Sequence, residues 1–314
     1  MIDQNLLRKD PMYVEKMVKR RNVTIEVSEF LNMDQERKMI QVQTEELQAQ
    51  RNKLAKEIGM LKAKGSSAED LMKKASYIPE KIDKLTEKLN VLQRDIHSWL
   101  SLIPNLPSDD VLVGKDETDN KVIRLMGAPT KFSFEPLDHV EIGERHGLDF
   151  DTAGKISGSR FSICYGKIAR LHRALGNFML DLQTSQNGYK EYSVPVVVNR
   201  EAMYGTGQLP KFEEDLFSVF KGGNQEGKQT AFLIPTAEVP LTNLVANTIL
   251  AEEELPLKFA ALTCCFRSEA GSYGKDTRGL MRQHQFDKVE LVNITKPSDS
   301  EASLEEMLSH AEMV

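Results

Sequence analysis

The sequence predicts an α+β fold in which an antiparallel helical hairpin precedes a domain built on an antiparallel β-sheet flanked by helices. Three observations support this prediction. Hydrophobic residues with a seven-residue period occupy residues 40–99, and a stretch at 103–114 with two prolines and a charged turn ends that pattern. Beyond it, short β-branched runs alternate with helical patterns, and two such runs flank a charged, glycine-rich connection at 262–292. A hairpin of this kind favours an antiparallel sheet over a parallel one.

The heptad pattern identifies the two helices of the hairpin. One row of hydrophobic residues runs through Ile40, Leu47, Leu54, Leu61, Leu71, Ile78, Leu85, Leu92 and Trp99, and a second row through Ala75, Ile82, Leu89 and Ile96. The polar stretch KGSSAED (64–70) interrupts the pattern, so we expect a first helix over 34–64 and a short turn before the second. Pro79 should weaken an early turn of that second helix.

The change in composition predicts three regions: a helical domain at 1–103, a linker at 104–114 and a second domain at 115–314. In the second domain, the pattern predicts an amphipathic helix over 169–188 that stops at Gly188. Residues 189–199 resemble a strand, and Pro195 within it belongs at a sheet edge or a strand end. Residues 238–250 resemble another helix.

Charge and cysteine content narrow the class of protein. The 41 Lys and Arg against 47 Asp and Glu give a net charge of −6, which excludes a uniformly basic surface but not a local basic patch. The basic run KMVKRRN (16–22) is interpreted as a solvated face. Cys164, Cys264 and Cys265 form no CxxC pair, and no apolar run has signal-peptide or bilayer length. We therefore expect a soluble, cytoplasmic protein without membrane contact.

The segment FRSEAGSYGKDTRGLMRQHQFDKVEL (266–291) concentrates the charged residues that could carry chemistry. If its two ends pair as strands with their polar faces together, one surface carries Arg267, Glu269, Arg282, Phe286 and Glu290. Guanidinium groups bind phosphate oxygens, and an aromatic ring can stack on a base. The alternative is a solvent-exposed ribbon with scattered ion pairs, which is common on the open face of a hairpin.

The same segment closely resembles motif 2 of the seryl-tRNA synthetases, a family of class II aminoacyl-tRNA synthetases. LDFDTAGKISGSRF (148–161) is similar to the family's entry into the catalytic domain, and residues 168–199 are similar to motif 1. GTGQLPKFEEDLF (205–217) and PTAEVPLTN (235–243) resemble the segments that follow. The helical hairpin matches the family's N-terminal tRNA-binding arm. Cys264 departs from the family, which usually has proline there, and should mainly affect packing.

The resemblance implies a serine–tRNA ligase that uses ATP, with Mg²⁺, to form seryl-adenylate and then charges the 3′ end of tRNA(Ser). The helical arm would bind the tRNA. Between residues 34 and 97 the arm carries thirteen Lys and Arg against eleven Asp and Glu, so composition alone does not decide between RNA and a protein partner. The motif 1 helix at 168–188 lies at a dimer interface in the family, so a homodimer is expected.

The resemblance also implies roles for individual residues. Arg267 would grip the α-phosphate and Arg282 the terminal phosphate of ATP, which makes both catalytic. The rest of the ATP site would be Ser268, Glu269 near the adenine or the tRNA end, and Phe286 stacked on adenine. The serine site would comprise Thr236, Ala237, Glu238, Arg267 and Glu290. An additional interpretation for Thr236 and Glu238 is a helix start, with the threonine as N-cap.

The resemblance stops before the family's third motif. That motif supplies a further ATP-binding arginine, and the magnesium-binding acid also has no match, so no metal ligand is assigned in this chain and a truncated polypeptide is expected. Two other functions stay open from the sequence. One is a non-catalytic tRNA-binding derivative of a synthetase. The other is a paralogue that activates an amino acid for a carrier protein, which would be expected to lack the long arm.

Overall fold

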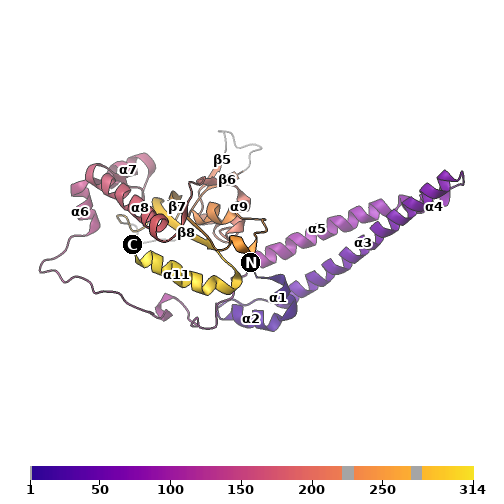
Figure 1. Cartoon of the computed structure of the whole chain (residues 1–314), viewed down its shortest axis with the longest axis horizontal. Coiled ribbons are helices and arrows are strands. Elements are labelled where there is room, and N and C mark those ends of the chain that lie inside the picture. The colour runs from indigo at the N-terminus through magenta and orange to yellow at the C-terminus, as the bar shows by residue number, and fades with distance from the viewer. Residues whose placement is uncertain (1, 221–229, 270–277) are drawn as a thin grey trace. The chain divides into compact units, whose positions relative to one another are not determined.

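The computed structural model describes residues 2–220, 230–269 and 278–314, and the chain divides into two compact units, Met1–Gly127 and Ala128–Val314. The first is helical and the second combines helices with short sheets (Figure 1). None of the helices in the described parts has the length and hydrophobicity needed to span a bilayer.

The helical unit is a long hairpin on a small base. Its helices are α1 (Gln4–Lys9), α2 (Pro11–Lys19), α3 (Val27–Ala63), α4 (Glu69–Ser76) and α5 (Ile78–Leu102). Helices α3 and α5 run antiparallel and pack against each other (Figure 1). The predicted heptad rows form their interface, where the buried members are Ile40, Leu54, Ile78, Ile82, Leu92 and Ile96. The predicted helical hairpin is therefore confirmed.

The ends of these helices differ from the prediction in two places. Helix α3 begins at Val27 rather than near residue 34, because Val27 and Phe30 are buried in the base core that α1 and α2 share. The second arm of the hairpin is interrupted at Tyr77, so that α4 and α5 are separate helices. Pro79 stands in the first turn of α5, where a missing N–H leaves no intrahelical bond unmade.

A buried carboxylate ties α3 to α1 at the base of the arm. The Asp34 side chain is 3% exposed and accepts hydrogen bonds from Arg8 Nε and Nη2, each at 2.8 Å. Arg37 Nε at 3.0 Å and Lys38 Nζ at 2.9 Å complete the network. The Arg8 guanidinium, helped by Lys38 and Arg37, holds the pKa of Asp34 well below its usual range.

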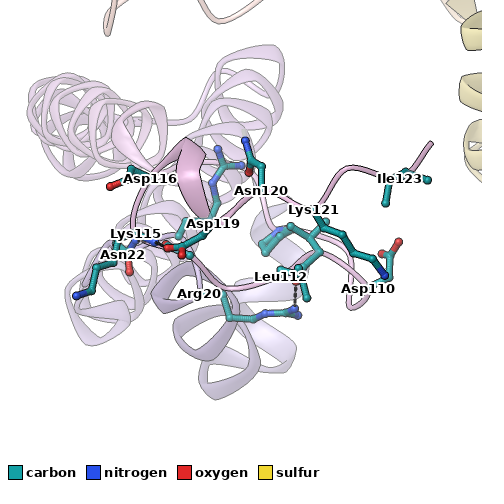
Figure 2. Close-up of a pocket in the computed structure, with 14 residues that line it drawn as sticks. Arg20, Asn22, Asp110, Leu112, Lys115, Asp116, Asp119, Asn120, Lys121 and Ile123 are labelled. Carbon is teal, nitrogen blue, oxygen red and sulfur yellow. Dashed lines mark hydrogen bonds between the residues drawn. The ribbon is translucent and has the colours of Figure 1, made fainter. Parts of the chain in front are cut away.

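The basic run at 16–22 binds the chain that follows α5. Arg20 Nη2 donates to the carbonyls of Asp109 (3.0 Å) and Val111 (2.5 Å), and Asn22 Nδ2 donates to Gly114 O (2.7 Å). Figure 2 shows Arg20 and Asn22 beside this linker, at a cavity of about 1020 Å³ with both acidic and basic residues in its lining. The exposed side chains of Lys16, Lys19, Arg21 and Asn22 agree with the interpretation as a solvated face, whereas Arg20 is partly buried. Arg20 and Asn22 in addition satisfy carbonyls of the irregular linker.

The second unit is built around a long hairpin. Its helices are α6 (His139–His146), α7 (Phe150–Ser157), α8 (Gly166–Gln186), α9 (Arg200–Gly205), α10 (Glu238–Asn243) and α11 (Ser300–Glu312). Its strands are β1 (Leu148–Asp149), β2 (Ile163–Cys164), β3 (Lys190–Glu191), β4 (Val197–Val198), β5 (Ser218–Phe220), β6 (Thr230–Leu233), β7 (Leu257–Phe266) and β8 (Gln285–Ile294). The sheets have the orders β1-β2, β3-β7-β8 and β4-β6-β5, and every pairing is antiparallel except β3 with β7.

Helices cover the β7–β8 hairpin on both faces. On one face Leu180 of α8 packs near Ala260, Leu262 and Leu291. Helix α11 lies on the same unit, where Lys258 Nζ and Glu306 Oε1 are 2.7 Å apart. On the other face Ala237 and Leu241, at the start of α10, pack with Phe259, Ala261 and Val292. The predicted class, an antiparallel sheet flanked by helices, is confirmed.

Two elements of this unit were predicted wrongly. Residues 189–199 form two short strands in different sheets, because Pro195 lacks an N–H and separates β3, which pairs with β7, from β4, which pairs with β6. The helix expected over 238–250 ends at Asn243. The Asn243 side chain donates hydrogen bonds to the carbonyls of Ala202 and Val239. Residues 244–247 form turns, and Asn247 has a left-handed backbone (φ 57°). The helix expected over 169–188 is α8, with Gly188 at φ 73° just beyond it.

Replacing Asp34 with asparagine should destabilise the helical unit by about 2–4 kcal/mol. Removing one partner of a buried charge pair costs about 3–5 kcal/mol, and the part exposure of Arg8 reduces this. Because the folded pKa of Asp34 is depressed, its stabilisation is complete above the ordinary carboxyl pKa of about 3.9 and is lost as the pH falls from there through the depressed value. Wild type and variant should therefore converge in acid.

Tryptophan fluorescence during urea unfolding measures this effect, since Trp99 is the only tryptophan and stacks on Phe30 with ring centroids 5.7 Å apart. Glu80→Gln is the matched control, because Glu80 forms an exposed pair with Lys84 on the same hairpin. Equal stability of the Asp34 and Glu80 variants would contradict the anchoring role of Asp34.

Candidate active site

The face of the β7–β8 hairpin that meets α10 carries the polar residues that the sequence singled out. Cys265 lies opposite Phe286 and Thr263 opposite Lys288, so these four side chains share a face. Cys265 is fully buried and Thr263 nearly so. This surface is therefore a half-buried site rather than a solvated ribbon. Cys264 points to the opposite face, where burial, reinforced by Asp287, raises the pKa of its thiol to about 11.

Arg267, just past the end of β7, is held against Phe286. Its guanidinium carbon lies 5.3 Å from the centroid of the Phe286 ring, which is within cation–π range. Its Nε donates to the Pro235 carbonyl at 3.3 Å, and its backbone N–H donates to His284 O at 2.9 Å. Among the described residues its terminal nitrogens have no hydrogen-bond partner. The two terminal nitrogens of a positioned guanidinium, with four N–H groups, are thus available for an anion.

Thr236, in the turn before α10, joins a closed polar network with β8. Its hydroxyl donates to Glu290 Oε2 at 2.5 Å and accepts from Lys288 Nζ at 2.8 Å. Lys288 Nζ also lies 2.5 Å from Glu290 Oε2. The hydroxyl further accepts the Glu238 backbone N–H at 3.2 Å, but the N-cap position of α10 is occupied by Ala237, so the interpretation of Thr236 as the N-cap was wrong by one residue.

Glu238 is the carboxylate of this site that lacks a neutralising contact. Among the described residues its side chain has no hydrogen-bond or ion-pair partner. Burial, and then the negative charge of Glu290, raise the pKa of Glu238, while Lys288 and Arg267 act in the opposite direction. A half-buried carboxylate without a partner is suited to bind an incoming cation such as an ammonium group.

Glu269 and Arg282 form a second charged pair, where the hairpin opens into its connection. Arg282 Nη1 lies 3.3 Å from Glu269 Oε2, and the Glu269 side chain is 11% exposed against 49% for Arg282. Glu269 has a left-handed backbone (φ 51°), and its carbonyl accepts a hydrogen bond from Arg160 Nη1 at 2.8 Å. The exposed guanidinium of Arg282 can therefore reach an anion while Glu269 stays anchored.

Ser268 and Ala237, also predicted for the site, make structural contacts within the protein. The Ser268 hydroxyl donates to Glu214 O at 2.7 Å, and its backbone N–H donates to Asp215 O at 3.0 Å. Ala237 is fully buried in the core beneath α10. These contacts place both residues beside the site, and any ligand contact would come through their backbones. Residues 270–277 of the predicted connection lie outside the described residues.

The sequence did not single out three residues that shape this site. Lys288 binds both Thr236 and Glu290. His284 Nδ1 lies 2.9 Å from Arg267 O. Arg160, with φ 62°, supports the Glu269 carbonyl, and its own carbonyl accepts the His284 backbone N–H at 2.9 Å. Alternation along β8 placed Lys288 on the right face, but nothing local marks Arg160 as a neighbour of residues more than a hundred positions away.

The described residues do not fit a resident metal ion. Within 2–220, 230–269 and 278–314, no group of three or more His, Cys, Asp or Glu side chains could hold one. The site instead presents the guanidinium groups of Arg267 and Arg282 at the end of the hairpin and the half-buried carboxylate of Glu238 at the start of α10.

Comparisons with known proteins relate the chain to families of known activity. The model of the seryl-tRNA synthetase N-terminal domain matches residues 1–107, and the model of the tRNA synthetase class II core domain (G, H, P, S and T) matches residues 217–314. The serine–tRNA ligases of Polynucleobacter asymbioticus and Herminiimonas arsenicoxydans are 53% and 52% identical to the chain. Each alignment covers 100% of this chain and 73% of the relative.

Solved structures show the same relationship. The seryl-tRNA synthetase of Pyrococcus horikoshii, complexed with ATP, superposes with a TM-score of 0.84 at 33% identity, over 100% of this chain and 74% of that one. The cytoplasmic serine–tRNA ligase of Naegleria fowleri, in complex with AMP, has the same fold with a TM-score of 0.81 at 24% identity, over 100% of this chain and 75% of that one. The identity over the whole chain and the agreement of both units show that this chain belongs to the seryl-tRNA synthetase family.

Proposed function

We propose that the protein is a serine–tRNA ligase that activates serine with ATP and transfers the seryl group to the 3′ end of tRNA(Ser). The observation that carries the proposal is the sheet face on which Arg267 lies against Phe286, near the carboxylate of Glu238 on α10, which has no partner among the described residues. Such a face can hold a nucleotide phosphate and an amino acid side by side. The family relationship supplies the identity of the amino acid.

Activation needs positioning rather than a general base. The carboxylate of serine is already an anion, and it attacks the α-phosphorus as the bond to pyrophosphate breaks, which leaves seryl-adenylate. Arg267 stabilises the charge that builds up on the α-phosphate oxygens, and Arg282 holds the terminal phosphate. In the second step, a hydroxyl of the terminal adenosine of tRNA attacks the seryl carbonyl carbon, and AMP leaves.

The remaining site residues take the roles that the family resemblance assigns. Phe286 stacks on adenine, with Glu269 and the backbone of Ser268 at the edge of the nucleotide. The resemblance places Thr236, Ala237, Glu238, Arg267 and Glu290 around serine, and from the contacts of the two acids we assign Glu238 to its ammonium group and Glu290 with Thr236 to its side chain. Mg²⁺ would accompany ATP, and no group of three or more acidic, histidine or cysteine side chains among the described residues could hold it.

The helical hairpin is proposed to bind tRNA(Ser). We assign residues 1–103 to this domain, 104–114 to a linker and 115–314 to the catalytic domain. The tip of the arm carries Lys62, Lys64, Lys73 and Lys74 around the turn between α3 and α4. Backbone recognition of RNA depends on such cations and weakens steeply with salt.

Replacing these four tip lysines with glutamine should therefore weaken tRNA(Ser) binding and lower the slope of log K against log salt by about one for each phosphate that a lysine no longer neutralises. Serine-dependent pyrophosphate exchange, which needs no tRNA, should be unchanged. Filter binding over a range of salt measures the first effect, and an unchanged slope would remove the arm tip from the tRNA interface.

A homodimer through α8 is proposed as well. Leu171, Leu175 and Phe178 are 53%, 45% and 52% exposed on this helix, with the spacing of one helical face. A second copy of the chain would cover them. Leu175→Glu should shift the protein toward monomer in sedimentation, and a wild-type protein that sediments as a monomer would refute this assignment. The three free cysteines fit a reducing compartment, and a cytoplasmic location is proposed on that ground.

Serine-dependent ATP–pyrophosphate exchange tests the proposed function, both on the 314-residue chain and on the full-length product of its gene. Arg267→Ala should lower the exchange rate by about 100-fold or more, because the variant lacks a positioned charge on the transferred phosphoryl group. Arg200→Ala is the matched control, since Arg200 pairs with Glu213 instead.

Exchange that depends on serine and on Arg267 supports the ligase. Absence of exchange in every form, with tRNA binding retained, would favour the non-catalytic derivative. Exchange without any transfer to tRNA would favour an enzyme that loads a carrier protein.

A further inference from the structure

Lys288 lies at the centre of the polar network on β8. Its ammonium is 2.8 Å from Thr236 Oγ1 and 2.5 Å from Glu290 Oε2, and the same Glu290 oxygen accepts the Thr236 hydroxyl at 2.5 Å. The side chains of Lys288 and Glu290 are 31% and 19% exposed. Because the two residues are separated by one position on a strand, they leave the sheet on the same face. The three groups therefore form a closed triangle that fixes each of them.

The triangle makes the two carboxylates of the site unequal. Oε2 of Glu290 is taken by Lys288 and Thr236, whereas among the described residues Oε1 has no partner. The Glu238 carboxylate has neither contact. An acid already neutralised by a lysine attracts a second cation weakly, but its free oxygen can still accept a hydrogen bond from a neutral hydroxyl. The unneutralised acid is the stronger site for an ammonium ion.

We infer that Lys288 is a positioning residue that reserves Glu290 for the hydroxyl of serine and leaves Glu238 to bind the ammonium group. This inference rests on the proposed function and deepens it. Without Lys288, two acids would compete for one ammonium, and the hydroxyl would lose its dedicated acceptor. Discrimination against alanine, which lacks only that hydroxyl, would fall, because selectivity of this kind depends on a polar group built for the hydroxyl.

The test is amino-acid-dependent ATP–pyrophosphate exchange by the full-length gene product, with serine and with alanine. Lys288→Met should lower kcat/KM for serine by about 10- to 100-fold, mainly through KM, and should lower the serine-over-alanine ratio by a similar factor. The KM for ATP should change by less than about twofold, since Lys288 contacts the amino acid side of the face. Lys288→Arg keeps the charge and should retain the ratio within about threefold of wild type.

Lys258→Met is the matched control. Lys258 is a lysine of the same hairpin that pairs with a glutamate, Glu306 at 2.7 Å, but on α11 and away from this network. The inference is overturned if the Lys288→Met and Lys258→Met variants have the same KM for serine. It is also overturned if activity toward serine and alanine falls equally, or if the arginine variant discriminates as poorly as the methionine variant. Absence of exchange in wild type would instead overturn the proposed function, and the inference with it.

Discussion

The ten-residue antiparallel pairing of β7 with β8 is the constraint on which the rest of the site depends. The register from Leu257 opposite Ile294 to Phe266 opposite Gln285 decides which side chains meet α8 and which meet α10. A slip of β8 by one residue would turn its side chains to the opposite face and bring Gln285 or Asp287, instead of Phe286, opposite Cys265. The buried face, with Ala260, Leu262 and Leu291 against α8, makes such a slip costly.

A second constraint brings the segment between β6 and α10 against the end of this hairpin. The Phe266 backbone N–H donates to Ile234 O at 2.9 Å, and Arg267 Nε donates to Pro235 O. Thr236 then reaches Glu290. These contacts join the two three-stranded sheets at one corner. Arg267, proposed to bind an anion, and Glu238, proposed to bind a cation, are brought near each other by this corner, as the proposed reaction between a carboxylate and a phosphate requires.

Local periodicity explains why much of this arrangement was predictable. The heptad rows specify the α3–α5 interface directly, and strand alternation placed Arg267, Phe286 and Glu290 on one face because the period of a strand is two. The failures came where tertiary contacts prevailed over local pattern. Residues 238–250 have a helical pattern, but Asn243 ends the helix by binding Ala202. The run at 189–199 has the pattern of one strand, but its first half pairs with β7 and its second half pairs with β6 in a different sheet.

The least predictable residues are those whose roles depend on distant partners. Lys288 could be placed on the site face from sequence, but its contact with Thr236 is set by the corner between the sheets. Arg160 owes its position to a left-handed backbone and to His284, neither of which a local pattern reveals. The resemblance to a family supplied the identities of ATP and serine, which no spacing of residues could give.

The central claim is that one face binds the nucleotide and the amino acid together, and a stable analogue of seryl-adenylate tests it most directly. Calorimetric titration of the full-length product with a seryl-sulfamoyl-adenosine should give an affinity at least about 100-fold higher than that for ATP or for serine alone. The analogue makes the contacts of both the nucleotide and the amino acid but loses translational and rotational freedom only once. The alanyl analogue should bind more weakly. An affinity no higher than that of AMP, with no preference for the seryl compound, would contradict a joint site on this face.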